Sequence, residues 1–270
     1  MELPVSGLKI RFRLPDGSDD LAISEASGET FERALEALRR LVQPEEHSGS
    51  ASLHGSRRDP WMALTIADFE ASLLGLRRFL FGDKVACVFR DKSHECEERM
   101  ELEFSIAALL EEAHPSPVRG VVPASGDAGW FQLTATSDSP IRFRLPSLRD
   151  QIEVAGKPQA AKLLARRCID GDKLDARTVA RVERAMESMA PSVSRPLAGN
   201  CPNCGKPVSV PLHVPHLVVE ELQASSTGVH EEIDAIAAAY HWEESAILAL
   251  PQKRRRAYAE TVRRRERGAV

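Results

Sequence analysis

Alternation of apolar and polar residues marks two short segments that lie far apart in the chain. The hexapeptide Ile-Arg-Phe-Arg-Leu-Pro occupies residues 10–15 and returns at residues 141–146. A period of two predicts a strand with one buried face, and the closing proline cannot donate to a β ladder. Turn residues, Ser6-Gly7 and Asp138-Ser139-Pro140, precede the two copies. Each copy is therefore expected to be the second strand of a hairpin.

After each copy the apolar period becomes that of an amphipathic helix. The first helix is expected to begin at Ser27, and the second has Pro158 in its opening turn. A further helix is predicted in each half, over residues 66–79 in the first and along an apolar stripe in the second: Val179, Val182, Ala185, Met186 and Met189. A cysteine followed at the same spacing by a period-two run, which predicts a strand, closes each half. Cys96 precedes Met100, Leu102, Phe104 and Ile106, and Cys204 precedes Val208, Val210, Leu212 and Val214. These parallels predict an internal duplication.

The repeat divides the chain into four segments. Residues 1–114 form a first repeat subdomain, 115–129 a linker, 130–228 a second repeat subdomain with a Cys-x-x-Cys knuckle, and 229–270 a helical, basic C-terminal extension. Each repeat is expected to contain a hairpin, helices and a cysteine knuckle with a strand, so the predicted fold class is α+β. The apolar face of the extension has no counterpart in the repeat, and we expect it to pack on the second repeat or on another protein.

Composition limits the function classes. The 270 residues carry a net charge of -4, and no apolar run reaches the roughly 20 residues of a membrane helix. Residues 1–7 lack the pattern of a secretory signal, and an odd number of cysteines, 5, favours a reducing cytoplasm over a disulfide framework. Basic residues concentrate after Gln252, which gives an acidic body a basic tail.

The sharpest local motif is Cys201-Pro-Asn-Cys204-Gly. Two thiolates on a tight turn form half of a tetrahedral zinc site, and the period-two run that follows disfavours a redox dithiol, which needs a helix N-terminus. The matching turn of the first half offers Cys96, with His94 and Cys87 nearby. One interpretation is a zinc ion shared by the two knuckles through Cys201, Cys204, Cys96 and either Cys87 or His94. The others are a metal held by the second knuckle with different ligands, and a turn without metal.

The remaining candidate residues have structural interpretations. Asp16, Asp19 and Asp20 follow a strand and are interpreted as a solvated turn. The pairs Arg39-Arg40, Arg77-Arg78 and Arg166-Arg167 are interpreted as helix-edge side chains, and Cys168 as a buried core thiol. Phosphate-binding glycine loops, nucleophile elbows and paired His-Glu zinc motifs are absent from the sequence. No enzyme is predicted.

Several segments resemble the T-even-phage-type baseplate hub assembly chaperone family, whose members occur in tailed phages and related extracellular contractile injection systems. They are residues 64–83, 96–102 before a strand, 201–205 before a strand, and 240–256. The resemblance extends over both halves and the C-terminal helices. It implies a non-enzymatic assembly or structural role at the baseplate, with hub, spike or tube proteins as partners and no catalytic residues to carry over. Family members often keep a second cysteine knuckle, from which Ser93 departs.

The C-terminal extension is the expected partner-binding element. Tyr240 and Trp242 are its expected anchors, with Ile247 and Leu250 on the same face and a basic cluster beside them: Arg254, Arg255 and Arg256. We expect assembly to take place in the cytoplasm, with retention in the finished phage or injection particle left open. The alternative function is a zinc-ribbon nucleic-acid-binding adaptor, which scarce aromatic residues and a pI near 6.1 disfavour. A thiol oxidoreductase would rest on one Cys-x-x-Cys motif.

Overall fold

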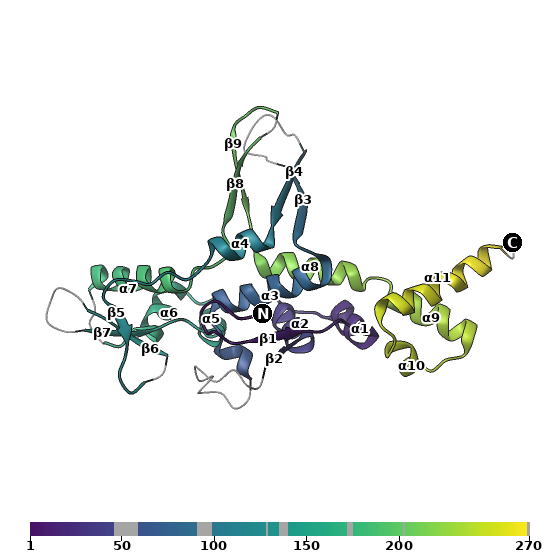
Figure 1. Ribbon diagram of the computed structural model, residues 1–270, viewed down its shortest axis with the longest axis horizontal. Coiled ribbons are helices and arrows are strands. Elements are labelled where there is room, and N and C mark those ends of the chain that lie inside the picture. The colour runs from purple at the N-terminus through teal and green to yellow at the C-terminus, as the bar shows by residue number, and fades with distance from the viewer. Residues whose placement is uncertain are drawn as a thin grey trace. The chain divides into compact units, whose positions relative to one another are not determined.

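The computed structural model describes residues 1–45, 59–90, 99–127, 129–134, 140–171, 175–201 and 203–268 (Figure 1). Helices and small antiparallel sheets coexist, which confirms the α+β class. The chain forms two compact units that are each discontinuous in sequence. Unit 1 comprises Met1–Ile10 and Pro44–His213, and unit 2 comprises Arg11–Gln43 and Val214–Val270. The four predicted segments describe a sequence repeat, which the division into compact units does not test.

Unit 1 carries three of the small sheets. Its strands pair as two hairpins, β3–β4 and β8–β9, and as a three-stranded sheet in the order β5-β6-β7. The elements in chain order are η1 (Pro60–Ala63), α3 (Ile66–Phe81), β3 (Lys84–Arg90), β4 (Arg99–Ser105), α4 (Ile106–Glu112), β5 (Val121–Pro123), β6 (Trp130–Leu133), β7 (Ile141–Arg144), α5 (Leu148–Val154), α6 (Ala160–Cys168), α7 (Ala176–Met189), β8 (Pro196–Asn200) and β9 (Pro207–Pro211).

Helix α3 forms the core of unit 1 and confirms the helix predicted after Thr65. The hydroxyl of Thr65 accepts a hydrogen bond from the Asp68 N–H and so caps the helix. Every residue from Ala67 to Arg77 is buried. A helix that is buried on all sides must give its polar side chains partners within the protein.

Three polar side chains of α3 meet this requirement through main-chain groups. Asp68 accepts from the N–H groups of Val5 and Ser6 near the N-terminus, both at 2.9 Å, although burial raises the pKa of its carboxyl. Glu70 accepts from the N–H of Val193 at 2.7 Å. Arg77 is 5% exposed and donates to the carbonyls at both ends of the turn into β3. The interpretation of Arg77 as a helix-edge side chain is therefore wrong.

The predicted hairpin around the second hexapeptide is confirmed. Strands β6 and β7 pair antiparallel, and Phe143, which is fully buried, faces an apolar cluster that includes Val182 of α7 and Cys168 of α6. Burial raises the pKa of Cys168 to about 11, as suits a core thiol. The turn residues Asp138 and Ser139 lie outside the described residues. The apolar stripe predicted for α7 thus packs on this sheet.

Unit 2 is helical. Strands β1 (Ile10–Phe12) and β2 (Val42–Pro44) pair where the chain passes between the units, and the helices are α1 (Gly17–Glu25), α2 (Thr30–Leu41), α8 (Val214–Ser226), α9 (Val229–Tyr240), α10 (Glu244–Leu248) and α11 (Gln252–Gly268). Helix α8 contradicts the predicted continuation of a strand to Val214. Strand β9 ends at Pro211, and apolar residues at helical spacing, Val214, Val218 and Leu222, are buried in α8.

The two hexapeptides fold alike locally. In the first copy, Arg13 forms a two-pronged ion pair with Asp19, with N···O distances of 2.6 and 2.7 Å, and Asp19 also closes a capping box at the start of α1. In the second, Arg144 pairs with Asp150 at 2.5 and 2.8 Å, and Asp150 closes the capping box of α5. This local similarity does not show that the two halves of the chain share one fold, and the duplication stays a prediction.

The acidic residues after the first hexapeptide therefore have a different role from the one expected. Asp16 is the N-cap of α1, while Asp19 and Asp20 are 2% and 1% exposed. Their interpretation as a solvated turn is wrong, because Asp19 pairs with the half-buried Arg13 and Asp20 pairs with the buried Arg255. Among the described residues, no helix combines the length and apolar character needed to cross a membrane.

Candidate functional site

The Cys-x-x-Cys knuckle forms the tip of the β8–β9 hairpin. The Cys201 N–H donates to the Lys206 carbonyl at 2.8 Å, and the Gly205 N–H donates to the Cys201 carbonyl at 2.9 Å. Gly205 has φ +69°, a left-handed conformation that strains other residues. Cys201 is buried and Cys204 is exposed. A strand follows the knuckle, as predicted, so the knuckle lacks the helix N-terminus that activates a redox dithiol.

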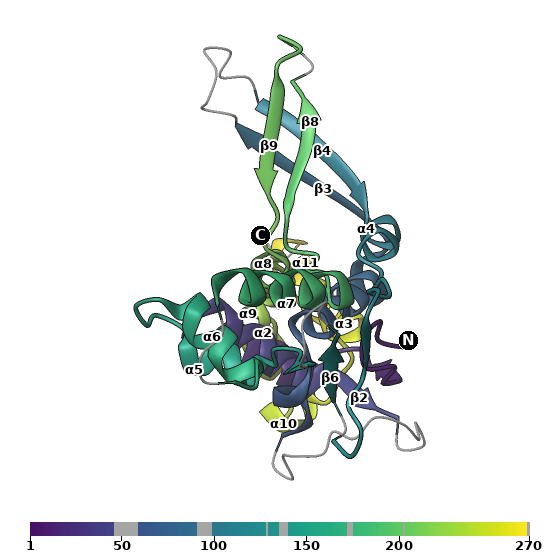
Figure 2. The same cartoon turned by 90° about the vertical axis from the view of Figure 1, so that its left-hand side faces the viewer.

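The β3–β4 hairpin lies beside the β8–β9 hairpin (Figures 1 and 2). Met100 of β4 packs in one buried cluster with Cys201 and Val208. This contact brings the start of β4 close to the second knuckle. Cys87 lies opposite Leu102 in the β3–β4 ladder, and its thiol is 3.7 Å from the Leu102 carbonyl oxygen. Burial raises the pKa of Cys87.

The ligand set expected for zinc is only partly visible. Cys96, His94 and Ser93 lie outside the described residues. Within the part of the chain that is described, no three His, Cys, Asp or Glu side chains gather in a way that could bind a metal. Cys87 therefore does not join Cys201 and Cys204 in such a group. Two cysteines on a tight turn fit half of a tetrahedral site, and a zinc ion shared by two knuckles stays a prediction.

If the knuckles share one zinc ion, purified protein is expected to contain about one zinc ion per chain. Cys204→Ser is expected to lose the metal and to unfold more readily, because site formation is coupled to folding. The matched control is Cys168→Ala, which removes a core thiol and should lower stability while the metal is retained. Elemental analysis that finds no zinc in protein prepared without chelator would contradict a metal site.

A second candidate site in unit 2 is a cluster of three aromatic rings with an arginine beside it, in which Trp242 is exposed and the two tyrosines are half-buried. We call it the aromatic surface: Tyr240, Trp242, Tyr258 and Arg254. The Tyr240 and Trp242 ring centroids are 5.4 Å apart, and Tyr258 of α11 lies edge-on to Trp242 at 5.2 Å. The Arg254 guanidinium lies 5.8 Å from the Tyr258 ring centroid. Trp242 is 37% exposed. Sequence reasoning missed Tyr258, although its spacing of four residues from Arg254 on one helix face was a usable signal.

Other predicted partner-binding residues have structural roles. Ile247 is fully buried in a cluster with Ile236 and Ala259, and Arg255 is 1% exposed. Leu250 is half-buried, and Arg256, also half-buried, donates to the Ser225 carbonyl and pairs with Glu232 at 3.4 Å. Ile247 and Arg255 are therefore not part of an exposed surface. The apolar stripe of the extension packs within α9–α11 and against α1, so it is core rather than an uncovered face.

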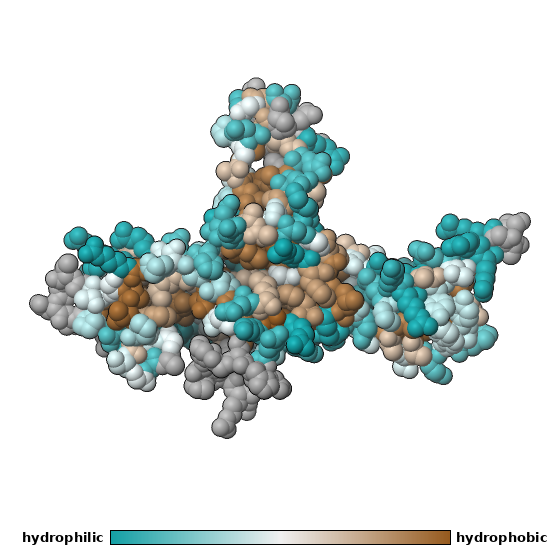
Figure 3. All heavy atoms as spheres, viewed as in Figure 1, coloured by the Kyte–Doolittle hydropathy of each residue, from teal (hydrophilic) through white to brown (hydrophobic). Residues whose placement is uncertain are grey.

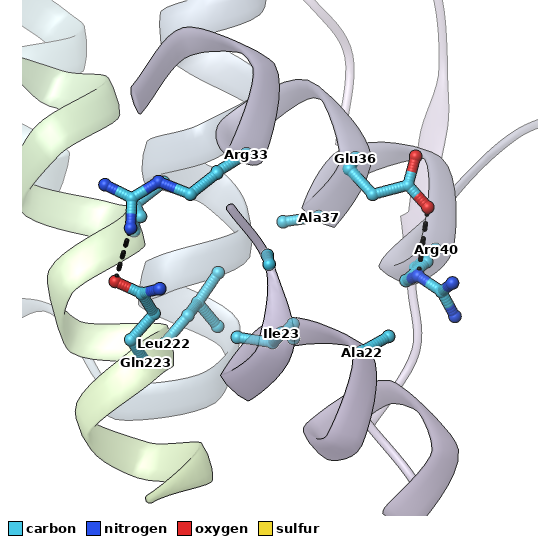
Figure 4. A pocket seen from close by; sticks show the side chains of 10 residues that line it. Ala22, Ile23, Arg33, Glu36, Ala37, Arg40, Leu222 and Gln223 are labelled. Carbon is cyan, nitrogen blue, oxygen red and sulfur yellow. Dashed lines mark hydrogen bonds and ion pairs between the residues drawn. The ribbon is translucent and has the colours of Figure 1, made fainter. Parts of the chain in front are cut away.

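A small pocket lies between α1, α2 and α8 of unit 2 (Figure 4). Apolar side chains such as Ile23 and Leu222 line it. Arg33 donates to the Gln223 side-chain oxygen at 2.7 Å, and Arg40 pairs with Glu36 on the other side. Its volume of about 20 Å³ is near that of a single water probe, far below the size of a small-molecule site.

No protein-family model, no curated protein and no solved structure matches the chain.

Proposed function

We propose that this protein is a non-enzymatic assembly chaperone or structural component of the baseplate hub of a phage-tail-like contractile injection system. It acts by binding a hub, spike or tube protein through the aromatic surface. The resemblance of segments in both halves and in the C-terminal helices supports the baseplate setting. The observation that carries the mode of action is the exposed Trp242 indole, which stacks against two tyrosines instead of packing into the core.

The physical basis is preorganisation. Tryptophan and tyrosine offer large contact areas and few rotatable bonds, and rings held against each other lose little further freedom on binding. Hot spots of interfaces are enriched in Trp, Tyr and Arg. Trp242 rests on Tyr240 and Tyr258, and Tyr240 in turn packs on the buried Ile236 cluster. A partner that covers Trp242 would therefore gain an anchor on a rigid base.

The basic residues of α11 suit an acidic rim on the partner. Figure 3 shows hydrophilic side chains along most of this helix. Lys253 and Arg254 are exposed at its start, and Arg263, Arg264 and Arg265 at its end. Charges at the rim of an interface act mainly on association rate and orientation. The same run of arginines is the feature that the alternative function, a nucleic-acid-binding adaptor, would use.

Trp242→Ala is expected to weaken binding to the baseplate partner by about 30-fold or more, because truncation of an interfacial hot spot removes about 2 kcal/mol or more. The measurement is co-purification and titration with the hub, spike and tube proteins of a contractile injection system. Phe79→Ala is the matched control, since Phe79 is 46% exposed but belongs to unit 1. Thermal melts of both variants check that each remains folded.

Two outcomes would contradict the proposal. Equal binding by Trp242→Ala and the parent protein would remove the aromatic surface as the binding element. Absence of binding to every baseplate protein, with tight and salt-dependent binding to a DNA or RNA oligonucleotide that is lost on replacing Arg263 and Arg264, would favour the nucleic-acid adaptor.

A further inference from the structure

Unit 1 contains a second basic site, a groove between α7 and the segment that leads into β5. Its volume is about 290 Å³. Three arginines, Arg119, Arg181 and Arg184, line it above an apolar floor of Val118, Leu133 and Ala185. We call it the arginine groove. Figure 3 shows hydrophilic side chains along α7.

The walls of the arginine groove are fixed by regular structure. Arg181 and Arg184 are three residues apart on α7, so they share one face of the helix. The segment that carries Arg119 is tied down on both sides, because the Ser116 N–H donates to the Ser188 carbonyl at 2.9 Å and the Thr134 N–H donates to the Gly120 carbonyl at 2.8 Å. The backbone positions that carry the three arginines are thus held by the fold.

The positive charge of the arginine groove is not neutralised by any carboxylate among the described residues. No carboxylate lines the groove, and no ion pair joins Arg119, Arg181 or Arg184 to an acidic residue among the described side chains. Arg184 donates to the Ala180 carbonyl of its own helix. Other arginines of unit 1 pair with carboxylates, as Arg144 does with Asp150 and Arg195 with Glu112. Three cations around one concavity repel one another, so an anionic ligand would be bound favourably.

We propose that the arginine groove binds an acidic peptide segment of a partner protein, with carboxylates on the arginines and an aliphatic side chain on the apolar floor. A guanidinium group matches a carboxylate through two parallel hydrogen bonds. Val118, Leu133 and Ala185 offer a surface for an aliphatic side chain, whereas none of the described residues that line the groove is aromatic and could stack a nucleic-acid base. This chemistry favours a peptide over a nucleic acid.

The proposal rests on the proposed function only in that the partner is a protein, and the groove is distinct from the aromatic surface. The probe is a fluorescein-labelled peptide of Asp, Glu and Leu residues, titrated against the full chain by anisotropy. An amide control peptide, with Asn and Gln in place of Asp and Glu, tests whether binding requires the carboxylate charges. Because the assay contains no baseplate protein, its failure leaves the Trp242 result standing, and the reverse also holds.

Arg181→Gln is expected to weaken binding of the acidic peptide about tenfold, the loss of one charge-assisted contact. Arg177→Gln is the matched control, since Arg177 is exposed on the same helix and does not line the groove. Circular dichroism checks that both variants keep their helices.

The proposal is overturned if Arg181→Gln and Arg177→Gln lose affinity equally, if the amide control peptide binds as tightly as the acidic peptide, or if neither peptide binds. It is also overturned if a single-stranded oligonucleotide of equal charge binds more tightly than the peptide and Arg181→Gln selectively weakens that binding. In that case phosphate, not carboxylate, is the ligand.

Discussion

Arg255→Leu is expected to destabilise unit 2 by about 3 to 5 kcal/mol, the usual cost of removing one member of a buried ion pair. Arg255 is 1% exposed, donates to Glu232 at 2.7 Å and also pairs with Asp20. Asp20 and Glu232 are themselves buried, at 1% and 6% exposure. Leucine would leave the Asp20 carboxylate without a counter-charge in a low-dielectric site, and Glu232 would keep only the half-buried Arg256.

The measurement is urea unfolding followed by circular dichroism, to which the helices of unit 2 contribute. Arg263→Leu on the exposed end of α11 is the matched control and is expected to change stability by less than about 0.5 kcal/mol. Adding Asp20→Asn and Glu232→Gln to Arg255→Leu should recover part of the loss, because neutral amides cost less to bury than carboxylates. An unchanged midpoint for Arg255→Leu would show that the ion pairs do not stabilise the unit.

Asp150→Asn is expected to destabilise unit 1 by about 2 to 4 kcal/mol at neutral pH. The Asp150 carboxylate accepts from two Arg144 nitrogens, from the Ser147 N–H and from Arg167 at 3.1 Å. Burial alone would raise the pKa of Asp150, but the hydrogen bonds from Arg144 and Ser147 outweigh it and hold that pKa well below the ordinary 3.8. An amide keeps the shape of the side chain and loses the charge.

The lowered pKa of Asp150 determines how the stability of unit 1 depends on pH. A carboxyl with a lowered pKa in the folded state contributes stability that is present above its unfolded value, near 3.8, and is lost as the pH falls below it. The difference in unfolding free energy between the parent protein and Asp150→Asn should therefore shrink below about pH 4. Asp127→Asn is the control, because Asp127 pairs with Arg142 but is 55% exposed, and exposed pairs contribute at most about 1 kcal/mol. A difference that stays constant with pH would contradict this account.

Local periodicity was enough to predict much of the secondary structure. The β6–β7 hairpin follows from alternation, and α3, α7 and α9 follow from apolar stripes with capping signals such as Thr65. Helix α8 was missed because the period-two reading was carried past Pro211 into a segment whose apolar spacing is helical. The cysteine knuckle was correctly placed before a strand. Which side chains lie near the knuckle depends on how two hairpins meet, and the spacing of residues along one strand does not report this.

The sequence by itself determined the fold class, most of the helices and the position of the knuckle, because each of these depends on neighbours within a few residues. Only the tertiary structure decided which charged residues are buried and which residues they pair with. Asp20 and Arg255 are 235 residues apart in sequence and form a buried pair. Arg119 comes from a loop and Arg181 from a helix, yet they line one groove. The sequence around a charged residue does not indicate which residue will pair with it. Its burial depends on which distant segment folds against it.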